Sequence, residues 1–263
     1  CDNKAFSKFA KKNVGIPEQI EFSIRYYTQK MGIKKFILYF QSFTNTYADI
    51  KTLKAKYDIA RKFPQIAGIS ISTRPDCIDE EKIKLIASYQ KDYLVWIEYG
   101  LQSTDNDVLM AFNRKHTYED FLSALELTRR YKINTGIHLI IGLAFALNKT
   151  VDDVQKVASL DIQGIKFHLL HVLKDTALDK LYTENKVRLL TEDEYIKAVC
   201  DFLERIPENI VILRLISNAN PNYFIAPLWM NKKSEVIAKI KEEFRKRGTH
   251  QGCACEKNEK ISE

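Results

Sequence analysis

Short apolar runs alternate with helical patterns through the first two thirds of the chain. Runs rich in Ile, Val, Leu and aromatic residues are typical of strands buried on both faces. They predict strands at residues 36–40, 66–71, 94–101, 133–141 and 164–170. Apolar residues spaced three or four apart predict helices near residues 50–63, 83–90, 121–128 and 151–160. This alternation predicts an α/β fold with a parallel sheet, and the pattern alone allows either a barrel or an open sheet.

The pattern changes after about residue 185. Thr191 and Glu194 have the spacing of a helix capping box. Residues 210–216 predict one more strand, and residues 232–246 predict a basic amphipathic helix. The polar residues that follow predict a loose tail. We therefore expect a core at residues 1–187 and a small C-terminal α/β extension at residues 188–263.

Polar side chains gather where the predicted strands end. In parallel α/β folds the carboxyl ends of the strands meet at one rim, where ligands bind. The candidates at this rim are Gln41, Ser42, Thr44, Asn45, Ser72, Arg74, Glu98, Gln102, His138, Lys166 and His168. Thr44 and Asn45 also suit a simple turn and helix cap, and Arg74 suits a surface ion pair.

Three of these candidates are ionisable groups inside predicted buried strands: Glu98, His138 and Lys166. A buried charge is costly unless it has partners. Three such groups in three strands favour a functional pocket.

Composition narrows the class of protein. Five cysteines, an odd and scattered set, are not typical of a disulfide framework and predict a reducing cytoplasm. No apolar run reaches the roughly 20 residues that span a bilayer, so we expect no membrane partner. The net charge of +7 and pI of about 9.0 permit a polyanionic partner.

Two further motifs have weak metal-ligand geometry. His168 and His171 are three residues apart, so they point to opposite faces unless the strand ends before His171. Cys253 and Cys255 are separated by one residue, which is not the usual spacing of zinc ligands.

Longer motifs carry a family resemblance. They are FQSFTNTYA, GISISTRPDC, WIEYGLQS, HLIIGL, GIKFHLLHVLKDTALDKLY and FIAPLW. In order and spacing the chain resembles the radical S-adenosylmethionine (SAM) enzymes of the YtqA/YhcC type, related to the catalytic subunit of Elongator. The resemblance implies a partial TIM-type (β/α)6 barrel whose first strand would lie upstream of residue 1.

The same resemblance implies a [4Fe–4S] cluster held by three cysteines. The opening CDNKAF makes Cys1 similar to the third of these, with the other two expected upstream. Such a cluster leaves one iron open for SAM. An electron from a donor such as flavodoxin or ferredoxin then cleaves SAM to a 5′-deoxyadenosyl radical, which abstracts hydrogen from the substrate.

The resemblance also gives the rim residues roles. The loop Gln41, Ser42, Thr44 and Asn45 would hold the amino group of SAM, and Arg74 beside Ser72 would pair with a carboxylate. His138, Ile140 and Gly142 would flank the adenine, while Glu98 and Gln102 would either accept from the ribose hydroxyls or orient the substrate. Glu98, Lys166 and His168 would be the catalytic residues. The chain departs from the family pattern at residues 142–150 and in RLISNANPN.

Three functions follow from these observations. The first is a radical SAM enzyme that modifies a tRNA wobble uridine, in keeping with the basic charge. The second keeps the chemistry but acts on a peptide or small metabolite. The third is a non-catalytic RNA-binding barrel. The sequence leaves the oligomeric state open.

Overall fold

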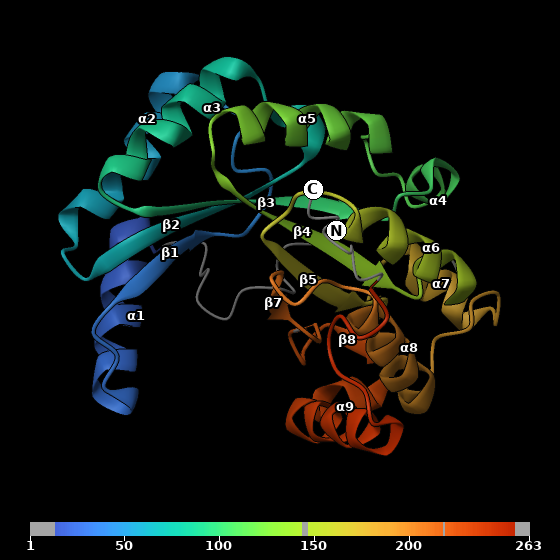
Figure 1. The fold of residues 1–263 in the computed structure, drawn as a ribbon. Coiled ribbons are helices and arrows are strands. Elements are labelled where there is room, and N and C mark those ends of the chain that lie inside the picture. Colours follow the sequence, from blue (N-terminus) through green and yellow to red (C-terminus); the bar gives the residue numbers. More distant parts are fainter. Residues whose placement is uncertain (1–13, 144–146, 218, 256–263) are drawn as a thin grey trace. The chain divides into compact units, whose positions relative to one another are not determined.

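The computed structural model describes residues 14–143, 147–217 and 219–255, and for residues 147–152 only the backbone (Figure 1). The helices are α1(Ile16–Met31), α2(Ile50–Tyr57), α3(Glu80–Ala87), α4(Asn106–Ala111), α5(Tyr118–Arg130), α6(Leu147–Ala158), α7(Ala177–Thr183), α8(Glu192–Glu204) and α9(Lys233–Arg247). The strands are β1(Phe36–Phe40), β2(Ile66–Thr73), β3(Leu94–Gln102), β4(Asn134–Ile141), β5(Gly164–Leu169), β6(Val172–Leu173), β7(Val211–Arg214) and β8(Phe224–Ala226). All six predicted strands are present, with ends shifted by at most two residues.

The main sheet has the strand order β1-β2-β3-β4-β5-β7, so neighbours in space follow one another in the chain. The pairs β1–β2, β2–β3 and β5–β7 are parallel. The predicted α/β fold is therefore confirmed. A second, antiparallel pair, β6–β8, and the helix α1 are features that the sequence pattern did not predict.

The chain divides into two compact units. Unit 1 comprises residues 1–101, 109–138 and 219–223, and unit 2 comprises residues 102–108, 139–218 and 224–263. The predicted boundary between residues 187 and 188 stays a prediction.

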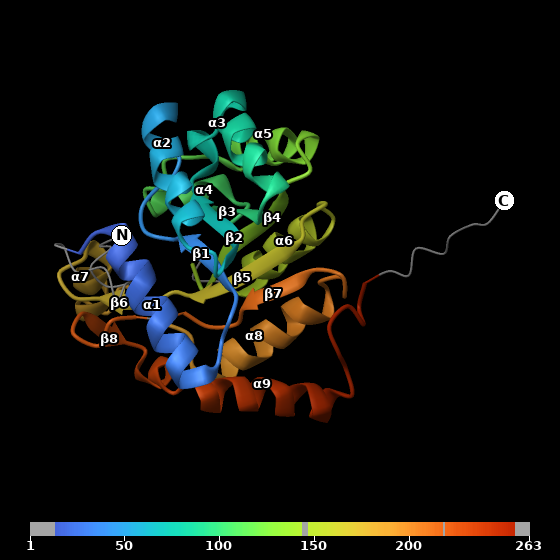
Figure 2. The same ribbon diagram turned by 90° about the vertical axis from the view of Figure 1, so that its left-hand side faces the viewer.

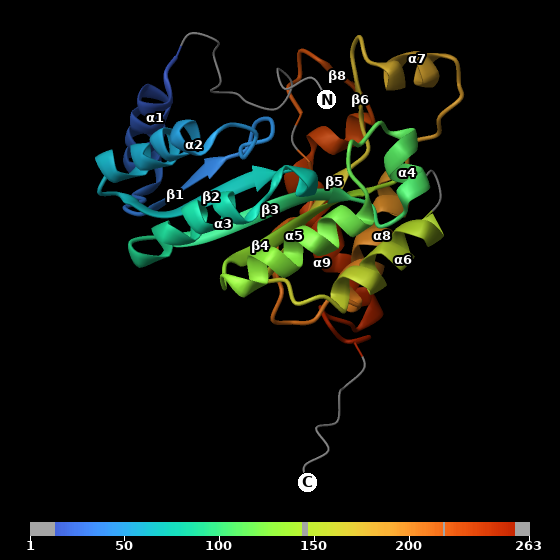
Figure 3. The same cartoon turned by 90° about the horizontal axis from the view of Figure 1, so that it is seen from above.

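In unit 1 the side chains along each strand point alternately to the two faces of the sheet. Tyr99 of β3 donates to Thr128 of α5 or accepts from it at 2.6 Å, and its ring meets Phe121 edge-on. Phe40 of β1 meets Tyr57 of α2 in the same way. Figures 1 and 3 show α2, α3 and α5 on this one face of the sheet. Because side chains alternate along a strand, Glu98 points to the opposite face.

Side-chain caps fix where the helices of unit 1 begin. Asp49 accepts from the backbone N–H of Thr52 at the start of α2. Asp79 does the same for Lys82 at the start of α3. Such caps satisfy backbone donors that the first helical turn leaves without partners. These caps fix where the chain passes from the polar loops after β1 and β2 into the following helices.

Unit 2 is built around α8, which is buried along most of its length. The predicted capping box is confirmed, because Thr191 and Glu194 each accept from the other's backbone N–H. The predicted basic helix is α9, which lies beside α8 (Figure 2).

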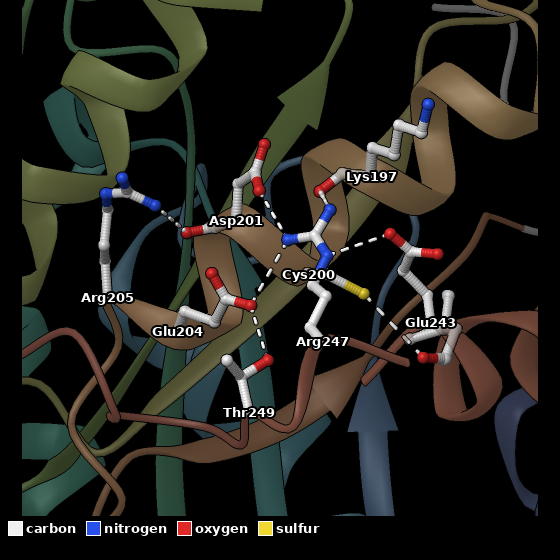
Figure 4. Close-up of polar contacts among 9 residues, drawn as sticks. Lys197, Cys200, Asp201, Glu204, Arg205, Glu243, Arg247 and Thr249 are labelled. Atoms are coloured by element: carbon white, nitrogen blue, oxygen red, sulfur yellow. Dashed lines mark hydrogen bonds and ion pairs between the residues drawn. The ribbon is translucent and has the colours of Figure 1, made fainter. Parts of the chain in front are cut away.

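Arg247, the last residue of α9, ties the two helices together (Figure 4). It donates to Asp201 at 2.6 Å, to Glu243 at 2.9 Å and to Glu204 at 3.2 Å. Burial lowers its pKa, but the hydrogen bonds to these carboxylates outweigh burial, and the pKa is raised overall. Part of the basic charge of α9 is therefore structural.

The tail after α9 was predicted to be loose, but its first residues are hydrogen-bonded to the end of α8 and the turn that follows it. The backbone N–H groups of Gly252 and Ala254 donate to the carbonyls of Leu203 and Glu204 at the end of α8. The side chain of Gln251 donates to the carbonyls of Pro207 and Ile210 at 2.9 Å each. Residues up to 255 thus cover the end of α8, and residues 256–263 lie outside the described part.

No described helix has the length and apolar character needed to cross a membrane. The cytoplasmic location stays a prediction.

Candidate active site

Glu98 is the centre of a buried hydrogen-bond network in unit 1. Its carboxylate accepts from Ser70 Oγ at 2.6 Å and from Tyr39 Oη at 3.0 Å. His138 Nε2 lies 2.7 Å from the same Oε2 that Tyr39 contacts. Glu98 is 5% exposed and His138 is 7% exposed. Four side chains from four successive strands, β1 to β4, thus meet on the face opposite α2, α3 and α5.

The hydrogen bonds of this network offset the free-energy cost of burying the Glu98 carboxylate. Each partner directs a polar hydrogen at an oxygen, and hydrogen bonds to charged groups are the strong ones. Of the residues predicted for the site, Glu98 and His138 are brought into direct contact. Tyr39 and Ser70 were not predicted, although the alternation of β1 and β2 places them on the same face.

The loop after β1 is held to β2 by Asn45. Its side-chain amide donates to the carbonyls of Phe40 and Ser72 at 2.8 and 2.9 Å, and its backbone N–H donates to Ser72 as well. The next residue, Thr46, is fully buried and bonds Thr73 and the carbonyl of Cys77. Asn45 therefore acts as a brace for the loop, and its amide nitrogen has two protein acceptors.

Two other predicted members of this loop, Gln41 and Ser42, line a groove. A hollow of about 400 Å³ lies between α1 and β1, and Gln41, Ser42 and Asn45 contribute to its wall together with Tyr39. The polar loop and the Glu98 network thus share one side of unit 1.

Arg74 forms the ion pair that the sequence analysis considered for it. Its guanidinium donates through Nε and Nη2 to both carboxylate oxygens of Asp76 and also reaches the carbonyl of Lys115. The bidentate pairing expected for a ligand carboxylate is therefore occupied by a neighbouring side chain.

Arg114 and His116 form a second polar group that the sequence analysis missed. Arg114 donates to the carbonyl of Gly100, while its buried Nε has no hydrogen-bond partner among the described residues. Burial, and then the nearby charge of Arg74, lower its pKa. His116 is 4% exposed and bonds the carbonyl of Leu101 through Nε2 at 3.2 Å. The sequence gives no sign that these two residues belong to the site, and only their hydrogen bonds to the end of β3 place them there.

His116 is the neutral tautomer with a free acceptor. A carbonyl accepts, so Nε2 carries the hydrogen and Nδ1 carries the lone pair. Nδ1 is buried, and no donor in the described part of the chain reaches it. Burial is the main cause that lowers the pKa of His116, which keeps the ring neutral. Near the end of β3, the Arg114 Nε donor and the His116 Nδ1 acceptor are therefore available to a ligand or to water.

Ser72, near the end of β2, is buried in unit 1, and Thr44 is half-buried on the loop after β1. The other predicted residues belong to unit 2. Lys166 of β5 is buried, and His168 on the same strand bonds Ser217 Oγ at 3.4 Å. Gln102 is buried and has a left-handed φ of 73°. Ile140 is half-buried on β4. These residues stay predictions for the site.

Gly142 ends β4 in a conformation that favours glycine. Its φ is 87°, and a Cβ there would lie 3.4 Å from the side chain of Leu190. The turn after β4 thus needs glycine for its backbone. The loop that follows, at residues 144–146, lies outside the described part, as does Asn218.

Asp153 anchors α6 to the turn after β3. Its carboxylate accepts from the backbone N–H of Thr104 at 2.5 Å, from the Thr104 hydroxyl at 2.6 Å and from Ser103 at 3.0 Å. Burial raises the pKa of Asp153, against the lowering effect of these bonds.

No set of three or more His, Cys, Asp or Glu side chains within the described residues could hold a metal ion. Cys1, the predicted cluster ligand, lies outside these residues. β5 ends at Leu169, so His171 lies beyond the strand, and its Nδ1 bonds the carbonyl of Leu169.

Comparison with known protein families assigns the chain. Residues 1–160 match the radical SAM superfamily, and residues 162–246 match the Radical_SAM C-terminal domain. The chain belongs to the radical SAM superfamily. The predicted family is thus confirmed, and members of this superfamily use a [4Fe–4S] cluster and SAM.

Individual proteins agree with this assignment. The uncharacterized protein YtqA of Bacillus subtilis (strain 168) is 35% identical over 83% of this chain and 68% of its own length. The tRNA uridine(34) acetyltransferase of Dehalococcoides mccartyi is 23% identical over 72% of this chain and 40% of its own length.

A solved structure has the same fold. The archaeal Methanocaldococcus infernus Elp3 superposes with a TM-score of 0.71 at 15% identity, over 89% of this chain. The chain spans 59% of that Elp3 chain. The predicted partial barrel of a radical SAM core is therefore confirmed.

Proposed function

We propose that this protein is a radical SAM enzyme that modifies a tRNA wobble uridine. The observation that carries the proposal is the buried Glu98 network on the sheet face opposite the helices. A barrel that served only as a scaffold would be more stable with apolar residues there, because buried charges cost free energy unless paired.

Two observations bear on whether unit 1 fits SAM. Arg114 Nε and His116 Nδ1 are buried without protein partners, which supplies one donor and one acceptor. A carboxylate and an amino or hydroxyl group are what such a pair binds. The residues present therefore fit an amino-acid ligand, with Arg114 the better candidate than Arg74, whose guanidinium is paired with Asp76.

When bound, the cluster and SAM supply a radical that abstracts hydrogen from the substrate. Cys1 is the candidate cluster ligand in this chain, together with two cysteines expected upstream. One electron donor of the flavodoxin or ferredoxin type is the further partner that the proposal requires.

The residues of the chain itself have positioning and proton-holding roles in this proposal. Asn45 keeps the loop after β1 in place, which fixes Gln41, Ser42 and Thr44. Glu98 orients His138 and Tyr39, and His138 Nε2 and the carboxylate hold a proton between them at 2.7 Å. Ser72, Gln102, Ile140, Gly142, Lys166 and His168 keep the roles that the family resemblance gives them.

The choice of RNA rests on charge and kinship. The net charge of +7 suits a phosphate backbone. The similarity to a tRNA uridine(34) acetyltransferase supports position 34 of tRNA as the target. The alternatives of a peptide, a small metabolite or a non-catalytic barrel predict an unaltered tRNA.

The test compares tRNA nucleosides from cells with and without the gene. We expect one modified uridine to disappear on deletion and to return with the wild-type gene. Glu98→Gln keeps the side-chain size but removes the charge, so we expect its nucleoside to fall roughly 100-fold. Glu242→Gln, on the exposed side of α9, is the matched control and should restore the nucleoside fully. An unchanged nucleoside profile on deletion would overturn the proposal.

A further inference from the structure

Phe43 and Tyr47 are the two most exposed large hydrophobic side chains in the described part of the chain. Phe43 is 77% exposed and Tyr47 is 81% exposed. Both lie on the loop after β1, at the carboxyl end of the strand, which is the ligand-binding edge of parallel α/β folds. Leaving two aromatic rings in water forfeits burial that the rest of the protein achieves for similar residues.

The loop that carries these rings is held firmly. Asn45 lies between them and bonds the carbonyls of Phe40 and Ser72. Thr46 is buried against Thr73, and the carbonyl of Asn45 accepts from Tyr57. The rings are thus displayed by a fixed backbone, which lowers the entropy cost of binding through them.

Phe43 also has an unusual backbone. Its φ is 65°, in the left-handed region that residues other than glycine rarely adopt. Strain of this kind persists where the surrounding structure imposes it, and it concentrates at functional positions. Glycine adopts this φ at no steric cost, so the presence of a phenylalanine here indicates a role for its ring.

Basic groups lie next to the loop. Arg74 directly follows Thr73, whose hydroxyl lies 2.6 Å from that of Thr46 on this loop. Arg74 in turn donates to the carbonyl of Lys115. Lys115 is exposed, and no ion pair is formed by its side chain with any described residue.

The other exposed aromatic pair of unit 1 provides a contrast. Phe22 and Tyr26 of α1 stack on each other with centroids 6.2 Å apart, and Lys30 lies over the Tyr26 ring. Those rings cover one another.

We propose that Phe43 and Tyr47 form a stacking platform for unpaired bases of the RNA substrate, with Lys115 contacting the adjacent phosphates. Exposed aromatic rings and basic side chains are the groups that bind single-stranded nucleic acid, because every base offers a π-face and every nucleotide a phosphate. A loop of unpaired nucleotides is the part of a folded RNA that can supply such bases. The inference rests on the proposed function, since it assumes that RNA is the substrate.

The test measures binding of an unmodified tRNA transcript to the full-length holoenzyme over a range of salt concentrations. For Phe43→Ala/Tyr47→Ala we expect the Kd to rise roughly 5- to 150-fold per lost stacking contact, with the same slope against salt. For Lys115→Ala we expect the salt slope to fall by about 1. Phe22→Ala/Tyr26→Ala removes the same two ring types from α1 and should bind like the wild type.

Two further measurements keep the outcomes distinct. Phe43→Trp/Tyr47→Trp retains stacking surfaces and should keep the affinity, while melting curves show that each variant is folded. Equal affinity of the alanine double variant and the wild type would overturn this inference and leave the proposed function standing. Absence of tRNA binding by the wild-type holoenzyme would overturn both.

Discussion

At the scale of single residues, the sequence shows which ionisable side chains are buried better than it shows which residues they bond. Glu98 and His138 stand out because charged residues are rare in buried strands, and they do meet. Arg74 was expected to bind a ligand, and in the structure its Nε and Nη2 donate to Asp76, only two residues away. Arg114 and His116 escaped notice because nothing in the sequence shows that the turn after α4 folds back to the end of β3.

Asp153 allows a pH test at this scale. Its folded-state pKa is raised above the ordinary value of 3.8 by burial. A raised pKa means that protonation favours the folded state, so the contribution of Asp153 to stability is full below pH 3.8 and is lost as pH rises through the folded pKa. We expect Asp153→Asn to remove this loss.

The measurement is urea unfolding at a series of pH values. The wild type should lose stability relative to Asp153→Asn as pH rises above 3.8. Asp161→Asn, an exposed change in the same unit, is the control. A constant difference in the free energy of unfolding across this range would contradict the prediction.

At the scale of elements, periodicity and caps were sufficient for most of the sheet and its helices. The capping box of α8 was visible as Thr191 and Glu194 because capping chemistry is local. The helix α1 was not predicted, and it contributes little to the core, since Ile20 is its only buried residue. The strands β6 and β8 are two and three residues long and pair across 50 residues of chain, which no local signal specifies.

Two threonine caps give a matched prediction. Thr191→Ala should reduce the free energy of unfolding by about 1 kcal/mol, because α8 packs its buried face into the core of unit 2. Thr176 caps α7, a helix with no buried residues, so Thr176→Ala should cost less than about 0.5 kcal/mol. Chemical denaturation of both variants checks the difference. Equal decreases in the free energy of unfolding would mean that the burial of α8 does not determine how much its cap stabilises the protein.

At the scale of the whole molecule, the superfamily could be recognised from long motifs, while the substrate could not. FIAPLW and WIEYGLQS are specific to a chemistry that the cofactor performs, so they say little about what the radical attacks. The charge of +7 points to an acidic partner but does not place the contact. That placement needs the exposure of Phe43 and Tyr47, which depends on the folded loop.

The cluster gives the test at this scale. We expect the full-length protein, reconstituted without oxygen with iron and sulfide, to show thiolate-to-iron absorbance. Cys1→Ser should lose most of that absorbance, because three thiolates are needed to hold the cube. Cys253→Ser/Cys255→Ser is the control and should keep it. Retention of the full signal by Cys1→Ser would remove Cys1 from the ligand set.

The segment that follows α9 has a practical consequence for anyone shortening this protein. Stopping the chain at Gly248 would strip donors from four carbonyls, those of Leu203, Glu204, Pro207 and Ile210. The carbonyls of Leu203 and Pro207 would keep the backbone donors of Ile206 and Ile210, while the bonds to Glu204 and Ile210 would be lost to water. A protein that ends so early should fray at the end of α8, whereas one that ends at Cys255 keeps all four of these contacts.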